Sequence, residues 1–256
     1  MRFEDTLEFA SCTDAGLIRP QNEDSLLFDA ANGFALLADG MGGYNGGEVA
    51  SALAVTLLAQ GLQSGLPALR QAQPAGDDAL ADIALLLRQQ IDNANIQIFR
   101  KSITQPELAG MGTTLLALVF CDKQAVVAHI GDSRLYCLHG QRLRQLTYDH
   151  TVLQARIDSG EITPEQAKRV PHKGMLTRAL GVEAAVETEL RGIDVMPGDI
   201  FLLCSDGLPD MLEGKEIQQV LSEAGGDLPA TAQRLVKMAN DNGGFDNISV
   251  VLVRVR

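Results

Sequence analysis

Four aspartates stand at the boundaries of apolar segments in the 256-residue chain. Asp39 follows FALLA, Asp206 follows IFLLCS, and Asp132 follows VVAHIG. Asp246 lies just before NISVVLVRV. Asp is disfavoured inside strands and common in turns, so one such position would be ordinary turn chemistry. Four of them constrain the fold, because strands that end side by side would gather their carboxylates in one place.

Carboxylates that lie within a few Å of each other repel and need a compensating cation. With backbone carbonyls and water they suit Mg²⁺ or Mn²⁺ better than Zn²⁺, which prefers His and Cys. The Gly40 carbonyl could approach such an ion, and Gly42 and Gly43 would let a substrate come close. DGMGGYNGGE lacks the Lys and hydroxyl positions of a nucleotide-binding loop. Pattern alone leaves two alternatives, a metal site and a chance set of Asp-Gly turns.

Strand-like and helical segments alternate along the chain. Helices are predicted at about 47–62, 78–100, 215–224 and 228–241, with a loop between the first two and a small helical excursion after residue 147. The strand-like runs of the first third are LEFAS, SLLFD and GFALLAD. TTLLALVF, QAVVAHI, RLYCLHG and QRLRQLT are predicted to form an antiparallel meander. The last strand-like runs are VETELRGIDV, DIFLLCSD and NISVVLVRV.

This order of elements predicts an α+β fold of two stacked antiparallel sheets flanked by helices, a four-layer α-β-β-α sandwich. We expect a single domain over 1–256. We place the carboxylate site at one end of the sheets.

Composition and net charge argue against several classes of protein. The net charge of −12 argues against sequence-independent nucleic-acid binding. The start MRFEDTLEFA does not resemble a signal peptide, and no apolar run approaches the length of a membrane span. The four cysteines are far apart in apolar stretches and predict buried free thiols. We therefore expect a cytoplasmic protein that binds neither nucleic acid nor membrane.

Nine motifs, in this order, resemble the metal-dependent protein phosphatases of the protein phosphatase 2C type in their compact bacterial form. They are GLIRPQNEDS (16–25), DGMGG (39–43), GEVAS (47–51), MGTT (111–114), GDSR (131–134), LTYDH (146–150), LTRALG (176–181), PGDIFLLCSDGL (197–208) and GGFDNIS (243–249). The resemblance covers nearly the whole chain, and it identifies 151–175 as the variable flap beside the active site.

The resemblance implies a set of metal ligands and catalytic residues. Asp39 would bridge two Mn²⁺ or Mg²⁺ ions, the Gly40 carbonyl would complete one of them, and Asp206 and Asp246 would hold the other. Asp132 would join Asp206 in binding a weaker third ion. Two such cations can activate a shared water and neutralise phosphoryl charge during in-line attack.

The resemblance also assigns three residues around the metals. Arg19 occupies the phosphate-binding position, where a guanidinium can clamp a phosphate with two hydrogen bonds. Glu23 and Asp24 would order metal-bound water without touching a metal. Arg19, Asp39, Asp206 and Asp246 would together form the catalytic set.

Met41 departs from one pattern of the family. Some relatives, mostly eukaryotic, carry a His there that is proposed as general acid, and methionine cannot donate a proton. Either a metal-bound water or another group such as His150 would serve. A capping and packing role for His150 is the favoured interpretation.

The implied activity is hydrolysis of phosphoserine and phosphothreonine in proteins, by a monomer that opposes a bacterial Ser/Thr kinase, which would itself be one substrate. The main alternative is a non-catalytic phosphoprotein-binding module that retains the fold. Such modules usually lose metal ligands, and here they are present. A second alternative is a stress-response phosphatase with one dedicated substrate, which shares the chemistry.

Overall fold

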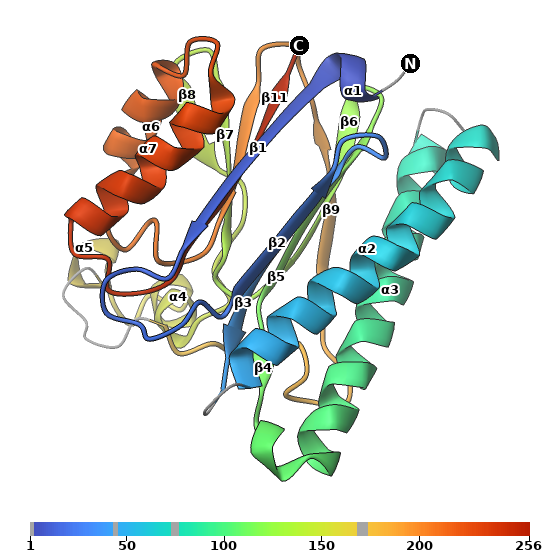
Figure 1. The fold of residues 1–256 in the computed structure, drawn as a ribbon, viewed down its shortest axis with the longest axis vertical. Coiled ribbons are helices and arrows are strands. Elements are labelled where there is room, and N and C mark those ends of the chain that lie inside the picture. The colour runs from blue at the N-terminus through green and yellow to red at the C-terminus, as the bar shows by residue number, and fades with distance from the viewer. Residues whose placement is uncertain (1–2, 43–45, 73–76, 168–173) are drawn as a thin grey trace.

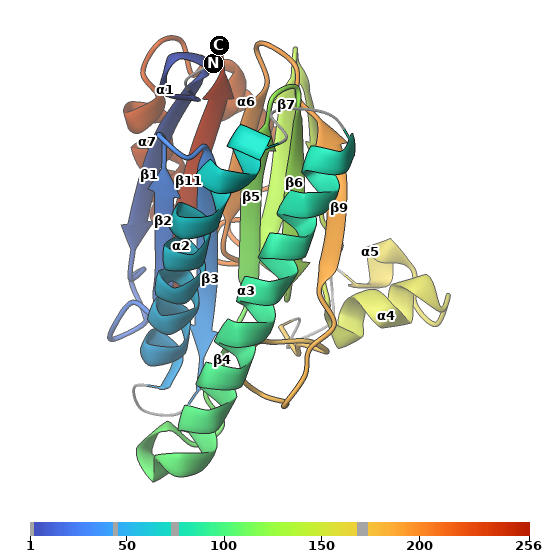
Figure 2. The same ribbon diagram turned by 90° about the vertical axis from the view of Figure 1, so that its right-hand side faces the viewer.

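The computed structural model describes residues 3–42, 46–72, 77–167 and 174–256. Two antiparallel sheets are stacked face to face (Figures 1 and 2). The long helices α2 (Gly46–Ala72) and α3 (Asp77–Thr104) cover one sheet, and α6 (Gly214–Ser222) and α7 (Leu228–Asp241) cover the other. The predicted α-β-β-α sandwich is confirmed.

Each sheet has a simple antiparallel order. The five-stranded sheet runs β1-β11-β10-β7-β8, from β1 (Leu7–Asp14), β11 (Ile248–Val255), β10 (Ile200–Cys204), β7 (Arg134–His139) and β8 (Arg142–Gln145). The second sheet runs β2-β3-β5-β6-β9, from β2 (Asp24–Asp29), β3 (Phe34–Met41), β5 (Leu115–Cys121), β6 (Gln124–Ile130) and β9 (Glu189–Asp194). Its sixth strand, β4 (Gly112–Thr113), pairs with the end of β3. The short elements are α1 (Phe3–Thr6) and the 3₁₀ turn η1 (Pro106–Leu108).

Successive residues of the central strands pack into different cores. Leu36 faces α2 and α3, whereas Leu37 faces the opposite sheet. Leu202 and Leu203 repeat this alternation on β10, with Leu202 toward α6 and α7. Because both faces of each sheet are covered, the central strands are apolar throughout, and every residue of β5 is buried. The two sheets are therefore fixed relative to each other by a continuous apolar layer.

The loop predicted after residue 62 is wrong in its first part, because α2 continues to Ala72 in spite of Pro67. Leu62 and Leu66 are fully buried on the same face of this extension. Their packing against α3 and the sheet outweighs the backbone hydrogen bond that Pro67 removes. By length and composition alone α2 would also suit a membrane span, but its apolar stripe is part of the core.

The predicted meander is wrong at one step. β6 and β7 are consecutive in the chain but belong to different sheets, so the turn at residues 131–133 crosses from one sheet to the other. Alternation of apolar residues indicates a strand but not its partner, which is why the sequence did not reveal this crossing. The crossing places Asp132 between the two sheets.

The region of the predicted flap contains α4 (Val152–Asp158) and α5 (Pro164–Ala167). Thr151 is the N-cap of α4 and accepts a hydrogen bond from the Gln154 N–H at 3.1 Å. Residues 168–173 of the predicted flap lie outside the described residues.

Replacing Phe201 by Ala should lower the free energy of unfolding by about 3–5 kcal/mol. Phe201 is fully buried between the sheets, where its ring meets that of Phe120 edge to face at 5.7 Å. Urea denaturation followed by circular dichroism measures the change. Leu85→Ala is the matched control, since Leu85 is 55% exposed on α3 and should change stability by less than about 0.5 kcal/mol. Equal effects of the two substitutions would contradict this account of the core.

Candidate active site

Asp39 lies beside Asp24 at the end of β3. The two residues are paired across β2 and β3, which puts their side chains on the same face of the sheet. The Asp39 N–H donates to Thr114 Oγ1 at 2.9 Å. Its carbonyl oxygen accepts from the Thr114 N–H at 2.8 Å and from the Thr113 hydroxyl at 2.9 Å. These three bonds fix the backbone that carries the carboxylate.

Gly40 stands where β2, β3 and the start of α2 approach too closely for a side chain. A Cβ on Gly40 would lie 2.1 Å from the Gly47 carbonyl oxygen and 2.6 Å from that of Glu23. The sequence interpretation used Gly40 only as a metal ligand, so this packing requirement is new. Gly42 lines the cavity described below, and Gly43 lies outside the described residues.

Asp206 and Asp246 lie at adjacent strand ends, just after β10 and just before β11, which are paired antiparallel. Ser205 links this end of the five-stranded sheet to the other sheet. Its hydroxyl donates to Asp24 Oδ2 at 2.8 Å and accepts from the Ser249 N–H at 3.0 Å. A single buried serine therefore sets the spacing between the carboxylates of the two sheets.

Asn247 is a second positioning residue, one that the sequence interpretation missed. Its Oδ1 accepts from the Glu23 N–H at 2.8 Å, and its Nδ2 donates to the Ala15 and Gln21 carbonyl oxygens at 3.0 Å each. The side chain thus ties the loop that carries Arg19 to β11. An Asn immediately after Asp246 at a strand start was the only signal in the sequence.

Asp132 reaches the same region from the turn that crosses between the sheets. The neighbouring Ser133 hydroxyl lies 2.8 Å from Thr114 Oγ1, which also accepts from the Asp39 N–H. Thr114 therefore couples the positions of Asp132 and Asp39.

These strand ends enclose a cavity of about 280 Å³. It is lined by Arg19, Glu23, Asp39, Gly40, Met41, Gly42, Thr114, Asp132, Gly174, Leu176, Asp206, Asp246 and Asn247. The structure thus brings together every predicted ligand and the predicted phosphate-binding arginine. Asp24 is the predicted site residue that does not line the cavity and lies behind Asp39 instead.

Burial and mutual repulsion both act on carboxylates of this cavity. Burial, followed by the charges of Asp24, Asp206, Asp132 and Asp246, raises the pKa of Asp39 well above its ordinary value. Burial and the neighbouring acids raise the pKa of Asp206 in the same way. Burial also raises the pKa of Asp132 to about 7 and that of Asp24 to about 6. Either protons or cations must compensate this charge.

The residues fit divalent cations by their chemistry. Among the described residues that line the cavity, Arg19 is the only basic side chain, and the remaining charged groups are carboxylates. Asp24 Oδ1 is buried and has no hydrogen-bond partner among the described residues. Oxygen donors in this number are what Mg²⁺ and Mn²⁺ prefer, and Gly40, whose carbonyl is a predicted ligand, also lines the cavity.

Arg19 lies at the mouth of the cavity. Its Nη2 donates to Asp246 Oδ2 at 2.7 Å, and its side chain is 51% exposed. This bond raises the pKa of Arg19, so the guanidinium stays charged. The exposed guanidinium is therefore placed to meet an anion that enters from solvent.

His150 is absent from the residues that line the cavity. Its Nδ1 accepts the Gly131 N–H at 3.1 Å, and its ring packs against that of His129 in a tilted arrangement, with centroids 4.7 Å apart. Burial, then the neighbouring His129 and Arg178, lowers its pKa to about 4, so the imidazole is neutral at physiological pH. The structure therefore gives His150 a packing role, while the N-cap of α4 is Thr151.

His150, His129 and Glu189 bring three possible ligand atoms within 4.8 Å of one another. A metal at His150 Nε2 would require the ring proton on Nδ1. Because Nδ1 already accepts the Gly131 N–H, the proton stays on Nε2, 3.5 Å from Glu189 Oε2. This trio is consequently a poor metal site.

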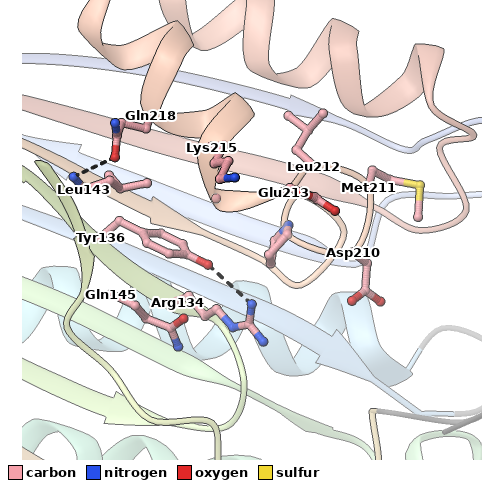
Figure 3. A pocket seen from close by; sticks show the side chains of 12 residues that line it. Arg134, Tyr136, Leu143, Gln145, Asp210, Met211, Leu212, Glu213, Lys215 and Gln218 are labelled. Atoms are coloured by element: carbon pink, nitrogen blue, oxygen red, sulfur yellow. Dashed lines mark hydrogen bonds between the residues drawn. The ribbon is translucent and has the colours of Figure 1, made fainter. Parts of the chain in front are cut away.

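A larger cavity, of about 650 Å³, lies between β7, β8 and the start of α6 (Figure 3). Arg134 on its floor binds Asp149 through Nε and Nη2, at 2.9 Å and 2.6 Å, and donates to the Tyr136 hydroxyl at 3.3 Å. An ion pair between Arg134 of the GDSR motif and Asp149 of the LTYDH motif thus joins these two motifs. Asp210, on the cavity wall, adds negative charge that raises the pKa of Asp132 and Asp206, and the sequence interpretation missed it.

The sandwich with a carboxylate cavity at one end places the chain in the class of metal-dependent phosphatases. A family model for protein phosphatase 2C matches residues 18–247, and the chain belongs to that family. It is a protein serine/threonine phosphatase, as relatives over nearly its whole length indicate.

The serine/threonine phosphatase stp of Listeria monocytogenes is 39% identical over 244 residues, which cover 94% of this chain and 93% of the relative. The protein phosphatase PhpP of Streptococcus pneumoniae is 34% identical over 259 residues, which cover 96% of this chain and 97% of the relative. The catalytic domain of the phosphatase PstP, solved in complex with two manganese ions, is 37% identical with a TM-score of 0.82, and the match covers 98% of each chain. These relatives do not favour the non-catalytic alternative.

The buried carboxylates predict that the metal-free protein loses stability as the pH rises from about 6.5 to 8. The pKa of Asp132 is about 7 in the folded chain, which therefore holds a proton there that the unfolded chain has already released, and the raised pKa values of Asp39 and Asp206 act in the same direction. This stabilisation disappears as the pH passes through the raised folded-state pKa values. The lowered pKa of His150 makes stability rise with pH instead, but this contribution ends near the ordinary histidine pKa of about 6.5.

Urea denaturation in chelator at both pH values measures this loss, which Asp132→Asn should reduce. Saturating Mn²⁺ should remove it, because cations replace the protons. A metal-free stability that stays constant or rises over this range would contradict the electrostatic account.

Proposed function

We propose that Asp39, the Gly40 carbonyl, Asp206 and Asp246 hold two divalent cations that the enzyme uses to hydrolyse phosphoserine and phosphothreonine. The observation that carries this proposal is the convergence of carboxylates from both sheets on one cavity. A related phosphatase structure with two manganese ions supports it. When bound, such ions supply Lewis-acid chemistry, which activates water and neutralises charge on a phosphoryl group.

Arg19 would bind the substrate phosphate. Its exposed guanidinium uses one N–H on Asp246, and its other donors can form hydrogen bonds to phosphate oxygens. Glu23 lines the cavity, where its carboxylate oxygens would accept hydrogen bonds from water beside the phosphate. Asp24, fixed by Ser205, would hold Asp39 in place from behind.

The leaving alkoxide would take its proton from water in the cavity. Met41 lines the cavity but carries no transferable proton. The neutral imidazole of His150 packs elsewhere. Asp132 and Asp206 would hold a weaker third cation, which would offset the burial and the neighbouring charge that raise the pKa of both residues.

The cellular setting is also a proposal. We place the enzyme in the cytoplasm, as a monomer that removes phosphate added by a Ser/Thr kinase and dephosphorylates that kinase as well. The buried free thiols of Cys121, Cys137 and Cys204 suit a reducing compartment. The net charge of −12 disfavours nucleic acid as a partner, and we expect no membrane contact.

Asp39→Asn should lower kcat/KM for p-nitrophenyl phosphate and for a phosphothreonine peptide by at least about 100-fold, because it removes the proposed bridging carboxylate. Phosphate release with saturating Mn²⁺ measures this loss. Asp194→Asn, on the exposed part of β9, is the matched control and should retain full activity. Full turnover by the Asp39 variant, or by the unchanged enzyme in chelator, would overturn the proposal.

A further inference from the structure

A second cavity, of about 340 Å³, adjoins the carboxylate cavity and shares two of its walls, Met41 and Leu176. The other walls come from the segment 177–187. The larger cavity of Figure 3 shares no lining residue with the carboxylate cavity. The second cavity, which we call the flank pocket, therefore lies directly beside the catalytic centre.

Apolar and polar residues line the flank pocket in similar measure, and the two residues that it shares with the carboxylate cavity, Met41 and Leu176, are apolar. Met41 and Val182 come together over Gly112, where a Cβ would lie 2.9 Å from Met41 Cε and 2.8 Å from Val182 Cγ2. Ala179, Leu176, Ala185 and Val186 complete the apolar walls. Val182 is nevertheless 48% exposed. A large aliphatic side chain is thus presented to solvent beside the active site.

The segment around the flank pocket is firmly anchored. Asn95 of α3 is 1% exposed; its Oδ1 accepts the Gly181 N–H at 2.8 Å and its Nδ2 donates to the Glu183 carbonyl oxygen at 3.0 Å. Thr113 and Leu180 exchange backbone hydrogen bonds of 3.1 Å and 2.8 Å. A pocket held in this way needs little ordering when it is filled, so binding loses little entropy.

The charges around the flank pocket restrict what it can hold. Arg178 is paired with Glu187 at 2.8 Å, and Glu183 adds a further carboxylate. Two acids against one paired guanidinium disfavour an acidic side chain, and the apolar wall of Met41, Leu176 and Val182 offers no hydrogen bonds to a polar one.

We propose that the flank pocket binds an aliphatic side chain next to the phosphorylated residue of the substrate, with Val182 and Ala185 setting this preference. The inference rests on the catalytic site proposed above. Neighbouring residues of a peptide are only about 3.8 Å apart at Cα, so a chain whose phosphate enters the carboxylate cavity brings an adjacent side chain to the shared wall. Substrate selection then comes from this wall.

Phosphothreonine peptides that carry leucine, serine or aspartate at each position flanking the phosphothreonine test the proposal with the Mn²⁺-loaded enzyme. Leucine at one flanking position should raise kcat/KM roughly tenfold over serine, mainly through KM, and aspartate there should lower it. Val182→Asp should abolish the leucine preference while the enzyme still turns over p-nitrophenyl phosphate. Leu85→Asp, on the exposed face of α3, is the matched control and should keep the preference.

Ala185→Phe is the second variant, because it fills the flank pocket from an exposed position and should also remove the preference. Equal kcat/KM for leucine and serine at every flanking position would overturn the proposal, as would a preference that survives both variants. Turnover of p-nitrophenyl phosphate separates the two hypotheses: its absence in the unchanged enzyme would refute the catalytic site itself, whereas its presence without a peptide preference refutes only the flank pocket.

Discussion

The gathering of carboxylates from both sheets at one end of the sandwich is the constraint on which the rest of this structure depends. Asp24 and Asp39 face the same side of one sheet, and Asp206 and Asp246 stand at the end of the other. Bringing them together costs free energy that only protons or cations can offset. Ser205 and Asn247 hold the strand ends in place, and the apolar layer between the sheets keeps the ends from separating. The stable sandwich thus maintains an unfavourable charge arrangement that becomes favourable when metal binds.

Elements with a strong local signal were predictable from sequence, whereas features that depend on tertiary partners were not. QAVVAHI coincides with β6, and the carboxylates at strand ends do converge. The continuation of α2 past Pro67 depends on Leu66 being buried against other elements, which no local pattern reports. The crossing between β6 and β7 was missed because alternation does not identify a partner strand. Motif resemblance, more than periodicity, identified the site residues.

Met41 links the chemistry of this enzyme to its selectivity. The sequence left open which group protonates the leaving alkoxide, because methionine cannot act as an acid where some relatives have histidine. In the structure Met41 lines both the carboxylate cavity and the flank pocket. Its side chain lies over Gly112, where a Cβ would be too close to it. An apolar residue at this position suits a boundary between a charged reaction centre and an aliphatic recognition surface.

Calorimetric titration of the metal-free protein with Mn²⁺ tests the central claim most directly, because it counts the ions that the carboxylates hold. The account predicts two tightly bound ions per chain, a weaker third, and the loss of both tight sites in Asp39→Ala, since that carboxylate would contact both. A single tight site, or two tight sites that persist in the variant, would contradict the claim that Asp39 bridges two cations.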